Sequence, residues 1–263
     1  MRILSLGAGV QSTTVALLVT HGELPMLDGA IFADTGWEPK AVYAHLDWLE
    51  KQLPYPVYRV SAKTNLSIRE KWERTTGTRF ISLPMFTENG GRLWRQCTKE
   101  WKIEPIEAKL RQLLGLAKGQ RARRGIQVEQ WFGISRDEAS RMRDSRHHWI
   151  AYRYPLIFDR PMDRTACLRW IQEHGYPAPP RSACIGCPFH SDAEWRRLKT
   201  DSPEEFQEAV VFERAVAQAT GDRQKQRAYL HRSLVPLDHV DFSTPEDRGQ
   251  LNWLEECEGL CGV

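Results

Sequence analysis

The chain lacks any apolar stretch long enough to cross a membrane. The longest apolar run near its start covers residues 15–19, whereas a spanning helix needs about 20 apolar residues. The first residues also lack the features of a signal peptide, because a glycine-rich turn interrupts them and no cleavage-type segment follows. We therefore expect a cytoplasmic protein with no membrane contact.

The sequence has little net charge, and it contains no internal repeat or low-complexity linker. A formal net charge of +3 is too small to imply nucleic-acid binding by itself. The hydrophobic fraction of 41% and the charged fraction of 27% are ordinary for a globular protein. The basic run at residues 118–124 is expected to be an exposed loop, with contact to a polyanionic substrate as the alternative.

Apolar periodicity alternates between strands and helices along the chain. Buried strands are predicted at residues 2–6, 29–33, 55–60 and 127–133, an extended segment at 154–157, and helices at 11–21, 39–52, 99–114, 164–174, 192–199 and 203–219. Because a β-α-β-α-β order implies a parallel sheet, we expect an open, mostly parallel α/β sheet with helices on both faces. This domain is placed at residues 1–160, and a C-terminal helical region with its tail at residues 161–263.

A glycine-rich turn joins the first predicted strand to the first helix. Gly7 and Gly9 would let backbone N–H groups approach phosphate oxygens at a helix start, where the helix dipole favours an anion. Ser5, Ser12 and Thr13 add hydroxyl donors. The segment has neither the Gly-Lys-Ser/Thr of a Walker loop nor the third glycine of the dinucleotide motif, since Ser12 stands there. These five residues are the predicted phosphate contacts, and a tight turn that serves packing alone is the alternative.

Two further motifs follow predicted strands, at the edge of the sheet where ligands bind in such folds. Asp34 ends the second strand, where its carboxylate could hold a ribose hydroxyl, an adenine amino group or Mg²⁺; an Asx turn or a helix cap is the alternative. Gly133 ends a later strand and Arg136 follows it. An arginine fork suits phosphate or sulfate. Arg143 and Arg146 are expected on a solvated helix instead.

Six cysteines in a chain expected in a reducing compartment favour metal binding or redox catalysis over structural disulfides. Cys184 and Cys187 form a Cys-x-x-Cys knuckle, which puts two thiolates within reach of one metal or cluster. Cys97 precedes basic residues that would favour its thiolate. Cys167 lies on the apolar side of a predicted helix, so we expect it in the core. Zn²⁺ would accept the same thiols, with another cysteine or His190 as its fourth ligand.

Taken in order, these segments resemble the phosphoadenosine phosphosulfate (PAPS) reductase family of the adenine nucleotide α-hydrolase, or PP-loop, superfamily. The matching pieces are residues 5–14, Asp34-Thr35-Gly36, the segment from Cys97 through Lys102 to Pro105, and Gly133 with Arg136. The resemblance covers roughly residues 1–190, and it is nearest to reductase-like proteins often encoded by phages and mobile elements. It implies an adenine nucleotide, ATP or PAPS, as the ligand.

In cluster-containing members of that family, a cysteine pair and a later Cys-x-x-Cys hold a [4Fe–4S] cluster. The resemblance therefore implies a cluster here with the ligands Cys97, Cys184, Cys187 and Cys257. Gln96 stands where the first pair would have its other cysteine. Cys261, Cys167 and an open iron site are the alternatives to Cys257.

The family's sulfonucleotide reductases also end in a Glu-Cys-Gly-x-His tail whose cysteine attacks sulfur. This chain keeps cysteines in its tail but has no histidine there. We therefore expect either sulfonucleotide reduction or ATP-dependent sulfur transfer, the latter with Mg²⁺ and slightly favoured. In both, Cys261 would handle sulfur and Arg136 would neutralise developing charge. The expected partners are a thiol or sulfur donor protein and, as the acceptor, a nucleic acid.

A hypothesis from another class is a zinc-stabilised nucleic-acid-binding protein on the same fold. The cysteines would then be structural, and the basic residues at 118–124 and 141–146 would contact phosphates. The metal content separates the two hypotheses, because iron–sulfur protein is brown and zinc protein is colourless.

Overall fold

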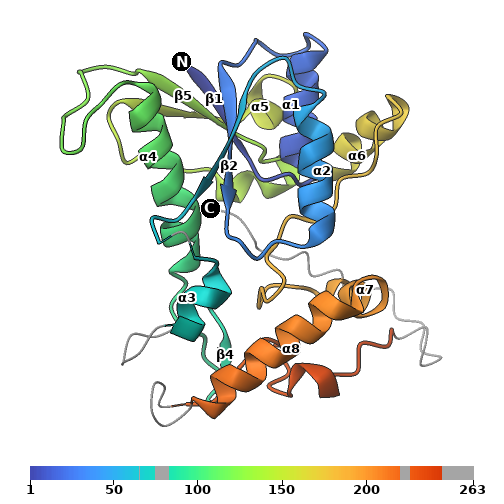
Figure 1. Cartoon of the computed structure of the whole chain (residues 1–263). Coiled ribbons are helices and arrows are strands. Elements are labelled where there is room, and N and C mark those ends of the chain that lie inside the picture. The colour runs from blue at the N-terminus through green and yellow to red at the C-terminus, as the bar shows by residue number, and fades with distance from the viewer. Residues whose placement is uncertain (65, 75–82, 220–225, 245–263) are drawn as a thin grey trace. The chain divides into compact units, whose positions relative to one another are not determined.

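The computed structural model describes residues 1–64, 66–74, 83–219 and 226–244 (Figure 1). Contacts within the chain divide it into two compact units. The first unit comprises Met1–Asn65 and Lys99–Ser182, and the second comprises Leu66–Thr98 and Ala183–Val263.

This division differs from the domain boundary expected at residue 160. Helix α6 (Arg164–Glu173) belongs to the first unit because it packs on α1 (Val10–Thr20). The composition of the chain likewise gives no sign that residues 66–98 belong to the second unit. Contacts between segments far apart in sequence define both features.

The first unit is built on a five-stranded parallel sheet. Its strands are β1 (Arg2–Leu6), β2 (Gly29–Asp34), β3 (Val57–Ser61), β5 (Val128–Phe132) and β6 (Ile150–Arg153). Their order across the sheet is β3-β2-β1-β5-β6, and every neighbouring pair is parallel. The chain leaves β1 on one side to form β2 and β3, then returns to form β5 on the other side. A topological switch point therefore lies between β1 and β5.

Helices cover both faces of this sheet, with α4 (Glu104–Leu113) on one side and α1 and α2 (Lys40–Glu50) on the other (Figure 1). On the α1 side, α5 (Pro155–Phe158) and α6 join the same core, which contains Leu4, Phe32 and Trp131 from the sheet. On the α4 side, Leu110 lies in a cluster with Ile31 and Val128. The predicted α/β fold class is confirmed. Strands buried on both faces explain why the sequence shows continuous apolar runs there.

One element of the first unit was wrongly predicted. The extended segment expected at residues 154–157 is helix α5, which begins at Pro155, and the preceding edge strand β6 was missed. Proline suits the first position of a helix because its missing N–H needs no partner there. The predicted helix at 99–114 also divides into a π-helical turn, η1 (Thr98–Ile103), and α4.

Helices dominate the second unit. They are α3 (Ile68–Arg74), α7 (Asp192–Asp201) and α8 (Pro203–Gln218), with a 3-10 turn η3 (Leu237–His239) and an antiparallel pair of short strands, β4 (Phe86–Thr87) and β7 (Ala228–Tyr229). Glu213 of α8 is buried, and its carboxylate accepts the backbone N–H of Leu230 at 2.7 Å and of Leu237 at 2.6 Å. These two hydrogen bonds connect the segment that follows β7 to α8. None of the described helices has the length and apolarity that crossing a membrane requires.

Candidate functional site

The candidate site lies at the carboxyl ends of β1 and β5, on the two sides of the switch point. β1 ends at Leu6 and continues through Gly7-Ala8-Gly9 into α1. β5 ends at Phe132, which is paired with Ser5 of β1, and continues through Gly133 toward the 3-10 helix η2 (Arg136–Arg141). In open α/β sheets, ligands bind in the crevice outside these strand ends.

Gly133 brings the end of β5 against the first turn of α1. A Cβ atom added at Gly133 would lie 2.5 Å from the backbone nitrogen of Ser12 and 2.6 Å from its Cα. No side chain fits at that distance, so glycine is required by close approach of two backbones. The N-terminal turn of α1, with its outward-facing N–H groups, is thereby placed beside the end of β5.

Hydrogen bonds of the Ser12 hydroxyl hold the turn between β1 and α1 in a strained conformation. Ala8 is buried with a φ of +56°, a left-handed conformation that costs an L residue about 1–2 kcal/mol. The Ser12 hydroxyl accepts the N–H of Gly7 at 3.2 Å and donates to the carbonyl of Gly9 at 3.3 Å. Ser182, which sequence analysis missed, lies in van der Waals contact range of the turn, 3.4 Å from a Cβ built at Gly9. Backbone strain of this kind is concentrated at ligand-binding turns.

Two of the predicted phosphate contacts are engaged elsewhere in the first unit. The Ser5 hydroxyl accepts a hydrogen bond from Nε2 of Gln130 at 2.7 Å. Thr13 is fully buried, and its hydroxyl lies 3.1 Å from Nε2 of His45 on α2. Burial lowers the pKa of His45 to about 4, so this imidazole is neutral at physiological pH. The contacts give no support to a phosphate role for Ser5 and Thr13, which stays a prediction.

Asp34 lies at the end of β2, one strand outward from β1. Its Oδ1 accepts the N–H of Gly36 at 2.7 Å and the hydroxyl of Tyr43 at 2.7 Å. Burial, with the hydrogen bond to this carboxylate, raises the pKa of Tyr43 above its usual value. Oδ1 of Asp34 therefore forms the Asx turn that was the alternative expectation. A nucleotide contact of Asp34 stays a prediction. Nearby in sequence, the buried carboxylate of Glu38 lies 3.8 Å from the ammonium of Lys102.

A polar network connects α1 to the segment after β5. Nε2 of Gln11 donates to Oγ of Ser135 at 3.5 Å and to the Glu138 carboxylate at 3.3 Å, while its Oε1 accepts from the Arg164 guanidinium at 3.4 Å. Sequence analysis missed all four residues. An amide and an arginine at a helix start carry no pattern of their own, and the network joins positions more than 120 residues apart.

Arg136 opens η2 and is exposed, and its backbone N–H donates to the carbonyl of Met162 at 2.9 Å. Arg141 forms an ion pair with Glu138 at 2.5 Å, whereas Arg143 is exposed. Two arginines, Arg136 and Arg164, therefore bring positive charge to the segments that flank the switch point. Such charge suits a phosphate or sulfate ligand.

The second unit contains the other predicted chemical groups. Cys97, Cys184 and Cys187 are reduced thiols; Cys184 is buried, and the other two are partly exposed. The N–H of Cys187 donates to the carbonyl of Cys184 at 3.0 Å, which folds the knuckle into a turn. The guanidinium of Arg95 lies 5.3 Å from the ring centroid of Phe189. Because these residues are two positions from Cys97 and Cys187, the two cysteine segments lie side by side.

The predicted cluster ligands are only partly placed. Among the described residues, no three His, Cys, Asp or Glu side chains are grouped so that they could hold a metal ion. Cys257 and Cys261 lie outside the described residues. Cys167 belongs to the first unit, where it is fully buried and burial raises its pKa to about 12. Its expected core position is confirmed, and the four-cysteine ligand set stays a prediction.

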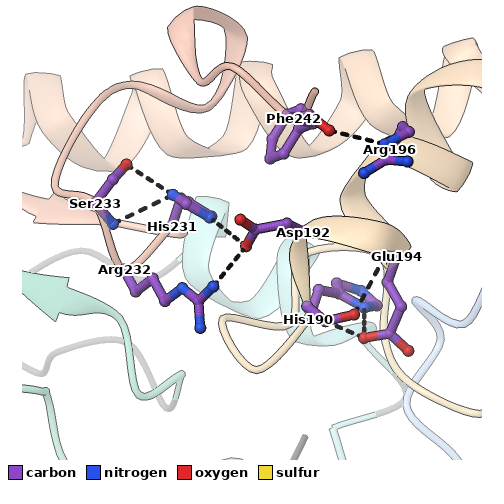
Figure 2. Close-up of polar contacts among 9 residues, drawn as sticks. His190, Asp192, Glu194, Arg196, His231, Arg232, Ser233 and Phe242 are labelled. Atoms are coloured by element: carbon purple, nitrogen blue, oxygen red, sulfur yellow. Dashed lines mark hydrogen bonds and ion pairs between the residues drawn. The ribbon is translucent and has the colours of Figure 1, made fainter. Parts of the chain in front are cut away.

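Two histidines, His190 and His231, make polar contacts with the first turn of α7 (Figure 2). Nε2 of His190 lies 2.9 Å from the carbonyl oxygen of Cys184, and Nδ1 lies 3.7 Å from the Glu194 carboxylate. Nδ1 of His231 accepts the N–H of Ser233 at 3.2 Å, so Nε2 carries the proton and donates to Asp192 at 3.2 Å. These contacts fix both segments to the start of α7.

No protein-family model and no curated protein matches the chain. Among solved structures, the chain is similar to a phosphoadenylyl-sulfate (PAPS) reductase from Candida auris, in a phosphate complex. The two are 13% identical with a TM-score of 0.47, over 68% of this chain and 74% of that chain. What the site does is therefore inferred from its own residues.

Proposed function

We propose that this chain is an adenine-nucleotide-dependent enzyme of sulfur metabolism, of the PAPS reductase type. The observation that carries the proposal is the approach of Gly133 to the first turn of α1, beside the Gly7–Gly9 turn. This approach puts helix N–H donors at the switch point, where open α/β sheets bind phosphates. The ordered motifs of the PAPS reductase family in the sequence support the choice of nucleotide.

Each element of the site has a role in this proposal. The N–H groups from Ala8 to Ser12 donate hydrogen bonds to phosphate or sulfate oxygens. Arg136 and Arg164 neutralise the negative charge that develops as the leaving group departs. Asp34 positions the nucleoside, or Mg²⁺ when ATP is cleaved between its α and β phosphates.

We also propose that Cys97, Cys184, Cys187 and Cys257 hold a [4Fe–4S] cluster. Support comes from the side-by-side cysteine segments and from the thiol chemistry of the donors. When bound, the cluster would supply electrons or an iron site for sulfur. His190 holds the backbone of the knuckle through the Cys184 carbonyl. The Cys261 thiolate would attack the sulfur of PAPS and displace adenosine 3′,5′-bisphosphate, or accept sulfane sulfur from a donor persulfide, releasing the donor thiolate, and pass it on as a Cys261 persulfide.

The reaction is tested with anaerobically purified protein and either ATP or PAPS. In ATP-dependent sulfur transfer, adenylation of the acceptor releases pyrophosphate, and displacement of the adenylyl group by sulfur releases AMP. PAPS reduction consumes two thiol equivalents and releases sulfite and adenosine 3′,5′-bisphosphate. Arg136→Ala should lower the active reaction by about 100-fold, whereas Arg143→Ala, an exposed arginine nearby, should leave it unchanged. Absence of every product together with absence of nucleotide binding would refute the proposal.

The metal is tested by absorbance and elemental analysis of the same preparation. A broad band near roughly 400 nm with iron and sulfide supports the cluster. Cys184→Ser should abolish that band, whereas Cys167→Ser, which alters a core thiol of the first unit, should retain it. A colourless protein with stoichiometric zinc would instead support the zinc-stabilised nucleic-acid-binding alternative.

A further inference from the structure

An exposed cluster of aromatic and basic side chains on the second unit has no role in the proposed nucleotide chemistry. It consists of the exposed Arg92, Trp94 and Arg95 and the partly buried Phe189, and we call it the Trp94 surface. Trp94 is 86% exposed, whereas every other tryptophan in the described part of the chain is buried or partly buried. Tryptophan offers the largest apolar face of any side chain and is highly buried on average in folded proteins.

A short hairpin holds this surface in place. The N–H of Leu93 donates to the carbonyl of Met85 at 2.9 Å, and the N–H of Thr87 donates to the carbonyl of Gly91 at 2.9 Å. Gly90 supplies the positive φ of +76° that the turn needs. Trp94 therefore follows directly on a hydrogen-bonded hairpin, and its exposure does not arise from an unanchored loop.

The arginines of the surface lie over an aromatic ring. The guanidinium carbons of Arg92 and Arg95 lie 5.5 and 5.3 Å from the ring centroid of Phe189. A third arginine, Arg227, lies 5.3 Å from the ring centroid of Tyr229, whose strand β7 pairs with the base of the hairpin. A cation–π contact of this kind does not use the N–H donors of an arginine, which can make bidentate contact with phosphate.

We infer that the Trp94 surface binds single-stranded nucleic acid. Single strands expose base faces that stack on an aromatic ring, and their phosphates pair with neighbouring arginines. Paired bases in a duplex are covered on both faces and do not offer this contact. Because Arg95 and Phe189 are each two residues from a predicted cluster ligand, a bound strand would lie beside the cysteine segments. Its role as the sulfur acceptor rests on the proposed function; the binding itself does not.

The test is the fluorescence anisotropy of labelled single-stranded DNA, single-stranded RNA and a duplex, titrated with the full chain without added ATP. Trp94→Ala should weaken single-strand binding about tenfold or more, and Trp94→Phe should retain most of it. The combined change Arg92→Ala and Arg95→Ala should lower the slope of log affinity against log salt by about 1.4. Phe158→Ala, at an aromatic residue of the first unit that is 68% exposed, should have no effect.

Three results would overturn the inference. They are equal affinity of the Trp94→Ala and unaltered proteins, equal binding of duplex and single strands, and Trp94-dependent binding to anionic lipid vesicles with none to oligonucleotides. Unchanged thermal unfolding of Trp94→Ala, expected from its exposure, verifies that the fold is intact. ATP titration of the same proteins separates the two proposals, because ATP binding without oligonucleotide binding contradicts only this one.

Discussion

Replacing Gly133 with alanine would put a methyl group where the backbone of α1 already lies. The added Cβ would be 2.5 Å from the nitrogen of Ser12, 2.6 Å from its Cα and 2.8 Å from the carbonyl carbon of Gln11. All three neighbours are backbone atoms, so no side chain can rotate away. Restoring ordinary contact requires α1 and the end of β5 to separate by roughly 1 Å, because non-bonded carbons pack at about 3.5–4 Å.

The expected cost follows from that displacement. Overpacking by one methyl group destabilises a close-packed interior by about 1–3 kcal/mol, and each kcal/mol lowers Tm by about 2–4 °C for a unit of this size. The same displacement moves the N–H donors of the first turn of α1. Nucleotide affinity should therefore fall along with the free energy of unfolding.

Gly7→Ala is the matched control, because it adds the same methyl group to the other side of the site. Its Cβ would lie 3.6 Å from the Ser182 hydroxyl and 3.8 Å from that of Ser12, which is ordinary contact. Its unfolding free energy should change by less than about 1 kcal/mol. Urea unfolding followed by circular dichroism makes the comparison. If Gly133→Ala unfolds at the same urea concentration as the unaltered protein, the proposed close approach is wrong.

Three further predictions concern buried groups. Stability should fall as pH drops from 6.5 toward 4, by about 3 kcal/mol at most, because unfolding returns the pKa of His45 from about 4 to 6.5 and lets it take up a proton; His45→Gln should flatten urea-unfolding stability across that window, and an unchanged slope would contradict the assignment. Glu213→Ala should cost about 2–4 kcal/mol in the same assay because it leaves two buried backbone N–H groups without their acceptor, and a loss below that of a typical surface substitution would count against it. Cys167, whose pKa burial raises to about 12, should resist iodoacetamide in folded protein from which any metal has been removed, while the partly exposed Cys187 reacts, as read by mass spectrometry; equal labelling of the two would contradict the burial of Cys167.

Much of the first unit was predictable because its signals are local. Strands buried on both faces appear as short apolar runs, and the helices between them show a helical period. The error at residues 154–157 arose where a short apolar run has no period that separates a helical turn from a strand. Cys167 was also placed correctly, because its neighbours on one helix face are apolar.

The candidate site likewise contains residues that the sequence indicates and residues that only the folded structure reveals. Gly7, Gly9 and Gly133 could be proposed from sequence, because glycines after strands predict turns near a ligand. The bridge from Gln11 to Arg164 could not, since amides and arginines occur throughout a protein surface. The Trp94 surface was equally hidden, because exposure is a property of the folded hairpin.

For this protein, the order of residues was enough to specify alternating strands and helices and a glycine turn at the start of α1. Those features depend on neighbours within a few positions, where side-chain spacing and backbone preference act directly. The three-dimensional packing alone placed the end of β5 against α1, assigned Thr13 to the core and laid Arg95 on Phe189. These contacts join residues 32 to 121 positions apart. They form only because burying the apolar faces of a sheet and its helices brings distant segments together.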